Sequence, residues 1–538
     1  MKKLGVLVSI LVILGLLFSF SVLWAQEGAS ELEIKTANEA FEKADKGNPD
    51  PAWKGQKLTI GVYSAGPRGA ISGPLYFWRP YFEKLTGATY DIVEIPFAEL
   101  REKIFTDLMT GTGTYDIIVG PSWFYGDYIS NDWIIPSDKY LNDPRMPKWE
   151  PESILPPLQE LYSWGGKWVG FNNDHDGQVL YYRRDILSDP KWQEEFKKET
   201  GKDLPVPPKT WEEVYEVAKF FNGKDWNGDG APDYGITMHL KVAGQGFFHF
   251  MALSAPYVVS PAPGDDPKKV TRYHNVYWFD PETMEPLVNT PGFVEALNML
   301  LKLSKTGPSA MWGWSLGEAW DAFLRGKAVI TFSWGDVGSL SQLPDRSVIQ
   351  GKLGVAPIPG SEKYYDLETK QWVEKRNFVA NTVGASWHGV ISKFSKNPDL
   401  AAYFLSWQAT APINHWNVVW GWTGVDPGTL YDLLQPTGKS TIEEYVATGY
   451  NAEDAAQFVN AYEEMWYKYP LKQSYLRIPG TPEMWEIWDI HLSEAVTGQV
   501  TPEEALNRTA EDWNAIIDRL GREQLKKIYQ EAIGYKPE

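Results

Sequence analysis

The sequence predicts an α/β protein, because short apolar strands alternate with amphipathic helices along the chain. Its 538 residues suit two to four units at about 150 residues per domain. Strands that alternate with helices form a parallel sheet covered by helices. The elements expected in the first unit are a strand over 57–63, a helix over 76–85, a strand over 90–95, a helix over 97–109 and a strand over 115–119.

Ligands of such sheets bind beyond the carboxyl ends of the strands. In the first unit those ends lead into residues 63–68 and 120–124. We therefore expect these two segments to border a binding site.

A second α/β unit is expected in the remainder of the chain. Thr210 with Glu213, and Thr501 with Glu504, show the spacing of a capping box, in which each side chain satisfies a free N–H group at a helix start. The elements expected there are a strand over 178–183, a helix over 210–221, a helix over 290–305, a strand over 328–332 and a long helix over 501–520.

The composition excludes several classes of protein. The formal net charge is −19, which argues against a nucleic-acid partner because phosphate backbones are bound by clustered Lys and Arg. The absence of cysteine excludes disulfides, thiolate metal sites and cysteine nucleophiles. The 26 tryptophans exceed what core packing ordinarily needs.

Residues 1–25 have the pattern of a secretory signal peptide. Lys2 and Lys3 precede an apolar run that reaches Leu23, and Ala25 is a small residue at the break. Cleavage there would release a periplasmic or extracellular protein, while retention of the run would leave a membrane anchor. Without a cysteine at the break the protein is not expected to be a lipoprotein. Residues 26–55 are polar with a weak helical pattern and are expected to form an N-terminal arm.

A calcium site is predicted in the loop that starts at Asp225. Oxygen-bearing side chains recur at alternate positions and Gly230 stands where the chain must turn, as hard, oxygen-seeking Ca²⁺ requires. Ile236 replaces the usual bidentate Glu, so the alternative is an Asx-rich turn without metal. The expected positions of this structural site are Asp225, Asn227, Asp229, Ala231 and Asp233.

The sequence offers little for catalysis, and we do not expect an enzyme. It contains no paired-histidine metal motif and no Gly-x-Ser-x-Gly nucleophile elbow. Asp174, His175 and Asp176 have acid–base side chains, but such an acidic cluster is more typical of a solvated loop.

Several tryptophans stand at loop positions, where they are available to a ligand. Sugar rings pack their C–H face on an aromatic plane, and their hydroxyl edges need carboxylates and amides. Loop tryptophans near acidic residues therefore favour a carbohydrate ligand, with plain packing as the alternative for any one ring. The tryptophans are Trp123, Trp334, Trp387, Trp420 and Trp422, and the acids are Asp116, Asp176, Asp336 and Asp426.

Short motifs from about Lys57 to Leu520 form an ordered set. They are 82–87 (FEKLTG), 115–141 (with YDIIVG and IIPSDKYL), 166–185 (with GKWVGFNND and VLYYRRD), 208–211 (PKTW), 233–236 (DYGI), 288–297 (VNTPGFVEAL), 323–334 (FLRGKAVITFSW), 354–359 (GVAPIP) and 384–397 (GASWHGVISKFSKN). In this order they resemble the extracellular solute-binding proteins of bacterial ABC transporters, of the maltose/oligosaccharide-binding type (family 1).

The resemblance implies a two-lobed periplasmic binding protein fold of type II, with a hinge of three crossings and the ligand in the interlobe cleft. The crossings are expected near 168–178, 327–334 and 380–388. Lobe 1 is expected to hold 56–167 plus 328–383, and lobe 2 to hold 168–327 plus 384–538. Extra material relative to typical members lies near 255–280, 360–380 and 410–475.

The resemblance also implies a function. The protein would be a monomer that captures a carbohydrate, an oligosaccharide by expectation, and delivers it to a membrane permease. Trp123, Trp334 and Trp387 would stack on the sugar, and Asp176 and Asp336 would pair with its hydroxyls. The full set of expected ligand-binding residues is Tyr63, Ser64, Ser122, Trp123, Asp176, Trp334, Asp336, Trp387, His388 and Trp422. The alternatives are a secreted glycoside hydrolase, or a peptide- or polyol-binding member of the same superfamily.

Overall fold

The structure, a computed structural model, describes residues 28–384 and 386–537. The expected signal peptide over 1–25 lies outside the described residues. None of the helices in the described part of the chain combines the length and the apolar character that crossing a membrane requires.

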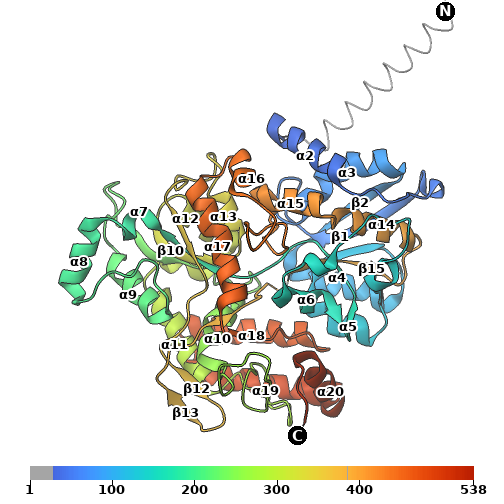
Figure 1. Ribbon diagram of the computed structural model, residues 1–538. Helices are drawn as coiled ribbons and strands as arrows, with labels where there is room; N and C mark the ends of the chain where they lie inside the picture. Colours follow the sequence, from blue (N-terminus) through green and yellow to red (C-terminus); the bar gives the residue numbers. More distant parts are fainter. Residues whose placement is uncertain (1–27, 385, 538) are drawn as a thin grey trace, which may run out of the picture.

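The first lobe surrounds a sheet with the strand order β2-β1-β3-β15-β4, and β7 pairs with β15 (Figure 1). β1 runs parallel to both β2 and β3, as the alternation of strands and helices predicts, while β15 runs antiparallel to β3. The strands are β1 Lys57–Tyr63, β2 Thr89–Ile95, β3 Ile117–Pro121, β4 Ile134–Ile135, β7 Phe171–Asn172 and β15 Trp387–Ser392. The helices of this lobe are α3 Ser72–Thr86, α4 Phe97–Thr110, α5 Tyr125–Ser130, α6 Pro156–Tyr162 and α14 Pro398–Gln408.

The second lobe surrounds a smaller sheet with the order β11-β8-β10-β9. Its central strands are buried at every residue, which is typical of strands covered on both faces. The strands are β8 Val179–Arg183, β9 Tyr234–Thr237, β10 Ala328–Ser333 and β11 Leu353–Ala356. The helices of this lobe are α7 Arg184–Leu187, α8 Pro190–Thr200, α9 Trp211–Phe221, α12 Leu316–Leu324, α13 Asp336–Leu340 and α17 Ala452–Lys468.

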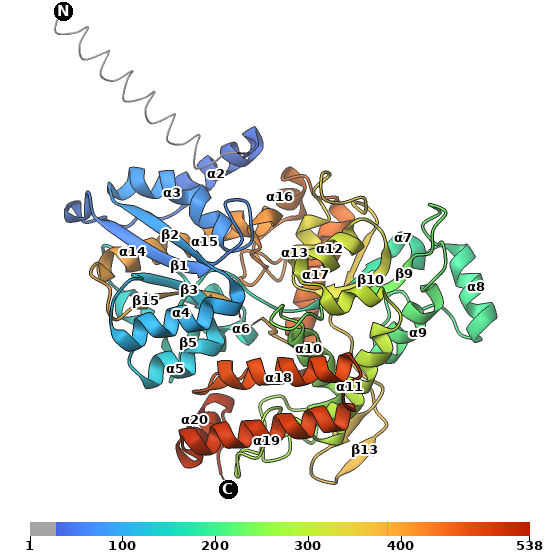
Figure 2. The same ribbon diagram turned by 180° about the vertical axis from the view of Figure 1, so that it is seen from behind.

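A helical layer extends the second lobe and is seen below both sheets in Figure 2. It is held together by a group of tryptophans, among which Trp278 lies 5.7 Å from Trp485 and from Trp488 between ring centroids. α18 also contacts the 3₁₀ helix η2 of the first lobe. The helices of this layer are α10 Phe247–Val258, α11 Pro291–Ser304, α18 Thr481–Val496, α19 Pro502–Leu520 and α20 Arg522–Ile533.

The N-terminal arm contains a helix, α2 Glu31–Lys43, that packs against α15 Ala411–Val419. The indole N–H groups of Trp416 and Trp420 both donate hydrogen bonds to the Thr36 hydroxyl. One further α-helix is α16 Ile442–Ala447. Three two-stranded sheets pair β5 Ser163–Trp164 with β6 Lys167–Trp168, β12 Tyr364–Asp366 with β13 Gln371–Val373, and β14 Val379–Ala380 with β16 Leu471–Lys472. The 3₁₀ helices are η1 Pro51–Trp53, η2 Ser122–Phe124, η3 Ser137–Tyr140, η4 Pro151–Ser153, η5 Ser309–Gly313 and η6 Gly421–Thr423.

The expected division of the chain between lobes is wrong after residue 327. β10 and β11 pair with β8 in the second lobe, so 328–383 does not belong to the first lobe. β15 pairs with β3, so 384–408 returns to the first lobe. Buried apolar strands look alike in sequence, and only their long-range pairing shows which sheet each one joins.

The crossings follow from this pairing. The chain passes between sheets over 173–178 and again from residue 381 to the start of β15 at Trp387, within two of the three expected ranges, and residue 385 lies outside the described residues. The expected crossing at 327–334 is wrong, because it coincides with β10. The third passage follows α15, where the chain returns to α17 on the second lobe.

The two expected capping boxes form only in part. The hydroxyls of Thr210 and Thr501 accept hydrogen bonds from the Glu213 and Glu504 N–H groups. The Glu213 carboxylate, however, accepts from the Lys209 N–H, and the Glu504 carboxylate pairs with Arg508. Each helix therefore has a hydroxyl cap without the reciprocal bond.

Candidate functional site

A small cavity lies where the two lobes meet, beyond the carboxyl ends of β1, β3 and β10. Its volume is about 40 Å³. A water molecule needs on the order of 10–15 Å³ by this measure, so the cavity has room for a few waters and not for a sugar ring. The lobes are therefore closed over the site, and a ligand larger than a few waters would enter only when they separate.

Aromatic rings form much of the cavity wall. Tyr63 at the end of β1 lies 5.7 Å from Trp387 at the start of β15, between ring centroids. The Trp334 indole N–H donates to the Val383 carbonyl at 2.6 Å. The Trp320 indole N–H donates to the Ser333 hydroxyl at 2.8 Å. These contacts fix the ring planes before a ligand arrives.

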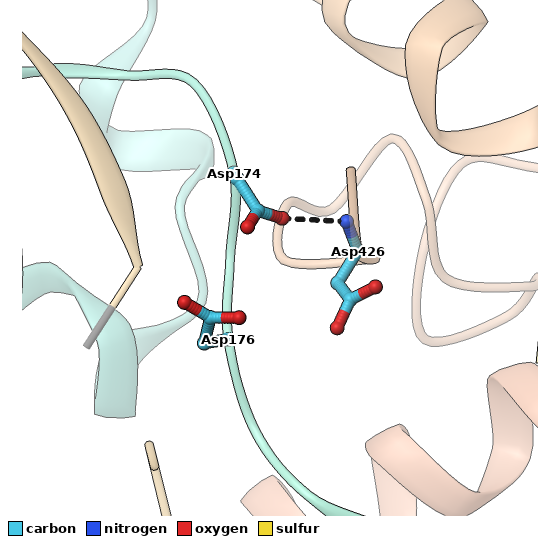
Figure 3. A group of neighbouring side chains, drawn as sticks. All are labelled: Asp174, Asp176 and Asp426. Atoms are coloured by element: carbon cyan, nitrogen blue, oxygen red, sulfur yellow. Dashed lines mark hydrogen bonds between the residues drawn. The ribbon is translucent and has the colours of Figure 1, made fainter. Parts of the chain in front are cut away.

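Carboxyl groups form the other part of the wall, and Figure 3 shows two of them, Asp174 and Asp176, together with the neighbouring Asp426. Asp174 and Asp176 come from the crossing between β7 and β8, and Asp426 comes from the segment after η6. One carboxyl oxygen from each lies within 4.8 Å of the other two. Asp336, the first residue of α13, also lines the cavity.

Hydrogen bonds hold two of these carboxyl groups in place. Asp174 Oδ1 accepts from the N–H groups of His175 and Asp426, both at 2.7 Å. Asp426 Oδ2 accepts from the Gly335 N–H at 2.7 Å and from the Tyr462 hydroxyl at 3.3 Å. The segment after η6 is thus tied both to the crossing and to the second lobe.

Asp176 differs from these two residues. Its backbone N–H donates to the Ser386 hydroxyl at 3.1 Å, but its buried Oδ2 has no hydrogen-bond partner among the described residues. Gly384 allows this packing, since a Cβ there would lie 2.4 Å from the Trp334 indole nitrogen and 2.5 Å from the Asp176 carboxyl carbon.

Burial raises the pKa of all four carboxyl groups. Desolvation is the main cause in each case, because low polarity disfavours the ionised form. Asp174 and Asp336 raise the pKa of Asp176 and Asp426 further. Asp336 also adds to the burial effect that raises the pKa of Tyr63.

Six of the ten expected ligand-binding residues line the cavity together. They are Tyr63, Trp123, Asp176, Trp334, Asp336 and Trp387. Sequence reasoning missed others on the wall, in particular Gln245 and Trp320, and it took Asp174 for part of a solvated loop. Asp174, His175 and Asp176 are in fact at most 6% exposed. Their place directly before a buried strand was the available signal.

The other four expected residues are placed elsewhere. The Ser64 N–H extends the β1–β2 pairing by donating to the Ile95 carbonyl, and Ser122 is fully buried in η2. His388 bonds to the Tyr125 hydroxyl and stacks on Tyr162. Trp422 packs beneath the guanidinium of Arg68 and beside Phe77 and Trp416, so it belongs to the first-lobe core.

A second interlobe cavity of about 300 Å³ lies on the other side of Trp123, which lines both cavities. Its wall is largely apolar and includes Phe247 and Trp485. Arg101 of α4 and Glu486 of α18 form an ion pair across it at 2.9 Å.

The expected calcium loop brings its acids together. Carboxyl oxygens of Asp225, Asp229 and Asp233 lie within 4.8 Å of one another. The Lys327 ammonium pairs with Asp229 and lies 3.7 Å from Asp233. The Asn227 amide donates to Asp233 at 2.8 Å. The ammonium group of Lys327 therefore interacts with two of the three carboxylates in this loop, Asp229 and Asp233.

Comparisons with known proteins place the chain among binding proteins. Residues 71–414 match the family model described as bacterial extracellular solute-binding protein. A relative in Brucella abortus named as a binding protein is 23% identical over 205 residues, 37% of this chain and 42% of that protein. The chain thus spans less than half the length of that relative. A Sinorhizobium fredii protein named "Probable amino-acid ABC transporter periplasmic-binding protein" is 21% identical, with 62% of this chain and 64% of that protein covered.

Solved structures share the fold. A solute-binding protein of Agrobacterium radiobacter in complex with ribitol has a TM-score of 0.63 and 20% identity, covering 86% of this chain and 98% of that one. A maltose-bound protein of T. maritima has a TM-score of 0.61 and 18% identity, covering 86% and 99%. At this identity the likeness shows the two-lobed architecture.

Proposed function

The chain belongs to the family of bacterial extracellular solute-binding proteins, and we propose that it is the substrate-binding component of an ABC importer for a carbohydrate, in particular an oligosaccharide. The observation that supports this most directly is the interlobe cavity, which combines aromatic rings with carboxyl groups. Trp334 and Trp387 would pack on the sugar faces, while Asp176 and Asp336 would accept hydrogen bonds from its hydroxyls.

Closure of the lobes would trap the ligand. Tyr63, Trp123 and Trp387 stand on the first lobe, and Trp334 and Asp336 stand on the second. A ligand that contacts both sets favours the closed state by its difference in affinity for the two states. The closed complex would then deliver the sugar to a membrane permease.

The cavity chemistry favours a sugar or polyol over an amino acid or peptide. Recognition of an α-carboxylate requires a cationic or N–H-rich pocket. No Lys or Arg is found among the described residues that line the cavity. The ribitol and maltose complexes of structurally similar proteins are in keeping with this choice.

We further propose that the protein is exported, acts as a monomer in the periplasm or outside the cell, and binds its ligand without turning it over. A glycoside hydrolase would need two carboxyl groups in an acid and a nucleophile or base role. Release of reducing sugar from an oligosaccharide panel measures this directly, and turnover that disappears in Asp176→Asn would establish the hydrolase instead.

The loop at Asp225 is proposed as a structural Ca²⁺ site. Asp225, Asp229 and Asp233 present converging oxygens of the kind that Ca²⁺ prefers. Lys327 competes for two of these residues, so the affinity depends on how readily its ammonium leaves.

Intrinsic tryptophan fluorescence titrated with sugars and polyols tests the binding function. We expect a saturable change that is lost in Trp387→Ala and kept in Trp312→Ala, a control at a half-exposed ring outside the cavity. A response to peptides or amino acids, with none to any sugar or polyol, would refute the carbohydrate assignment.

A further inference from the structure

The interlobe cavity gathers several acidic side chains that have no basic partner in its wall. Asp174, Asp176 and Asp336 line it, and Asp426 shares the space of the first two. No basic side chain is found among the described lining residues. Bringing several carboxylates together in a medium of low polarity is unfavourable unless a proton or a cation accompanies them.

One carboxyl oxygen is left for a ligand. Asp176 is 6% exposed, lines the cavity, and its Oδ2 has no partner among the described residues. Leaving a buried acceptor unpaired is unfavourable, because the group has lost its water partners without gaining others. The carboxyls of Asp174 and Asp426 accept from backbone N–H groups, and Oδ2 of Asp176 is the carboxyl oxygen that would gain a partner from a donor in the cavity.

The spacing of the acids indicates what kind of cation fits. Carboxyl oxygens of Asp174, Asp176 and Asp426 lie within 4.8 Å of one another. An ammonium group has three donors, and three acceptors at about 2.8 Å around one tetrahedral nitrogen stand about 4.6 Å apart, which lies inside this limit.

The aromatic walls are also suited to a positive charge. The faces of Trp and Tyr rings attract an ammonium group within about 6 Å. Tyr63, Trp334 and Trp387 line the same cavity as the acids, and these rings also suit the C–H faces of a sugar.

We propose that the ligand is an amine-bearing carbohydrate, whose ammonium group is held by Asp174, Asp176 and Asp426 while its ring packs on the cavity tryptophans. This inference rests on the proposed function and specifies the substrate class of the same site.

The test measures binding of matched sugar pairs to the full chain by calorimetry at pH 7.5. The pairs are glucosamine and glucose, galactosamine and galactose, mannosamine and mannose, and β-1,4-linked oligomers of glucosamine and of glucose. In at least one pair we expect the amine to bind at least tenfold more tightly than the neutral sugar. Added salt should reduce that preference, because it screens charge–charge attraction.

Two variants identify the group responsible. Asp176→Asn keeps the shape of the side chain, and we expect it to lower the ratio of amine affinity to neutral-sugar affinity in the preferred pair to about one. Asp116→Asn is the matched control, since Asp116 is also buried but precedes β3, at the end of that strand opposite to Ser122. It should leave the preference intact.

The remaining outcomes each overturn the inference. If a neutral sugar binds and no amine binds more tightly, the site recognises hydroxyl groups and not an ammonium group. The proposed function then still stands. If CaCl₂ alone binds and neutral sugars bind only in its presence, the acids hold a metal ion. If no carbohydrate of either kind binds, the proposed function fails together with the inference.

Discussion

The indole N–H of Trp334 donates a 2.6 Å hydrogen bond to the carbonyl oxygen of Val383. Trp334 follows β10 of the second lobe, and Val383 lies in the crossing that leads to β15 of the first lobe. A ring in the cavity wall is thus fixed directly to the hinge. Ligand contact with this ring and the position of the crossing are therefore physically coupled.

Trp334→Phe tests this coupling, because phenylalanine keeps an aromatic face but leaves the buried Val383 carbonyl unpaired. We expect a loss of about 1–3 kcal/mol in the free energy of unfolding, together with weaker ligand binding. Urea unfolding and fluorescence titration measure the two effects. Trp320→Phe is the control, since the Trp320 indole N–H donates to the Ser333 hydroxyl of the same lobe and not to the hinge. Equal effects in both variants would contradict a special role of the hinge bond.

Gly384→Ala should prevent full closure. The new methyl group would meet the Trp334 ring and the Asp176 carboxyl within 2.6 Å, at a φ of 109°. Gly521→Ala is the matched control, because its φ is 98° and nothing lies within 4 Å of the added carbon. We expect Gly384→Ala alone to weaken ligand binding at least tenfold and to keep the radius of gyration at its larger, open value in small-angle scattering. Compaction by ligand in this variant would show that the clash is relieved elsewhere.

Stability should fall as the pH rises from about 4 to about 7. Burial raises the pKa of Asp336 to about 7, so its neutral form is favoured in the folded, closed state. The stability that this group contributes is fully present below its unfolded pKa, near 4, and is lost as the pH rises through about 7. One such group changes the free energy of unfolding by at most about 1.4 kcal/mol per pH unit. The titratable groups in the same cavity wall or adjoining it are Tyr63, Asp174, Asp176 and Asp426.

Thermal unfolding from pH 4 to pH 8 checks this expectation. Asp336→Asn should be less dependent on pH than the parent protein, and the difference should appear mainly between pH 4 and pH 7. A parent protein whose unfolding temperature rises over this interval would contradict the assignment of a neutral buried acid.

Calcium should raise the unfolding temperature if the loop at Asp225 binds it. A ligand that binds only the folded protein at 100 times its Kd stabilises it by about 2.7 kcal/mol. Asp229→Asn should abolish the shift, and EDTA should reverse it. Lys327→Met should enhance it, because the ammonium no longer shares Asp229 and Asp233. No calcium effect in either the parent protein or Lys327→Met would rule the site out.

Local patterns predicted the individual elements well. Periodicity and turn residues indicated β1, α3, β2, α4 and β3 to within a few residues, and parallel pairing followed from their alternation. Patterns did not show which sheet β10 and β15 join, because a fully buried strand presents the same apolar run in either place.

Some residues of the candidate site could likewise be predicted from the sequence, and the place of others depends on tertiary packing. Tyr63, Trp123 and Trp334 were found because each follows the end of a strand, where such sheets bind ligands. Trp422 met the same loop-and-glycine criterion but packs under Arg68, since only its neighbours decide whether a ring faces a cavity or a core.

By itself, the sequence determined the α/β class, the order of the elements and a ligand chemistry of aromatic rings and acids. The tertiary structure alone decided how those acids act as a group. Asp174 and Asp426 are 252 positions apart, and a single N–H···O bond brings them to one cavity. Burial and mutual charge then raise the pKa of each, a property of the assembled site that no individual residue has in the extended chain.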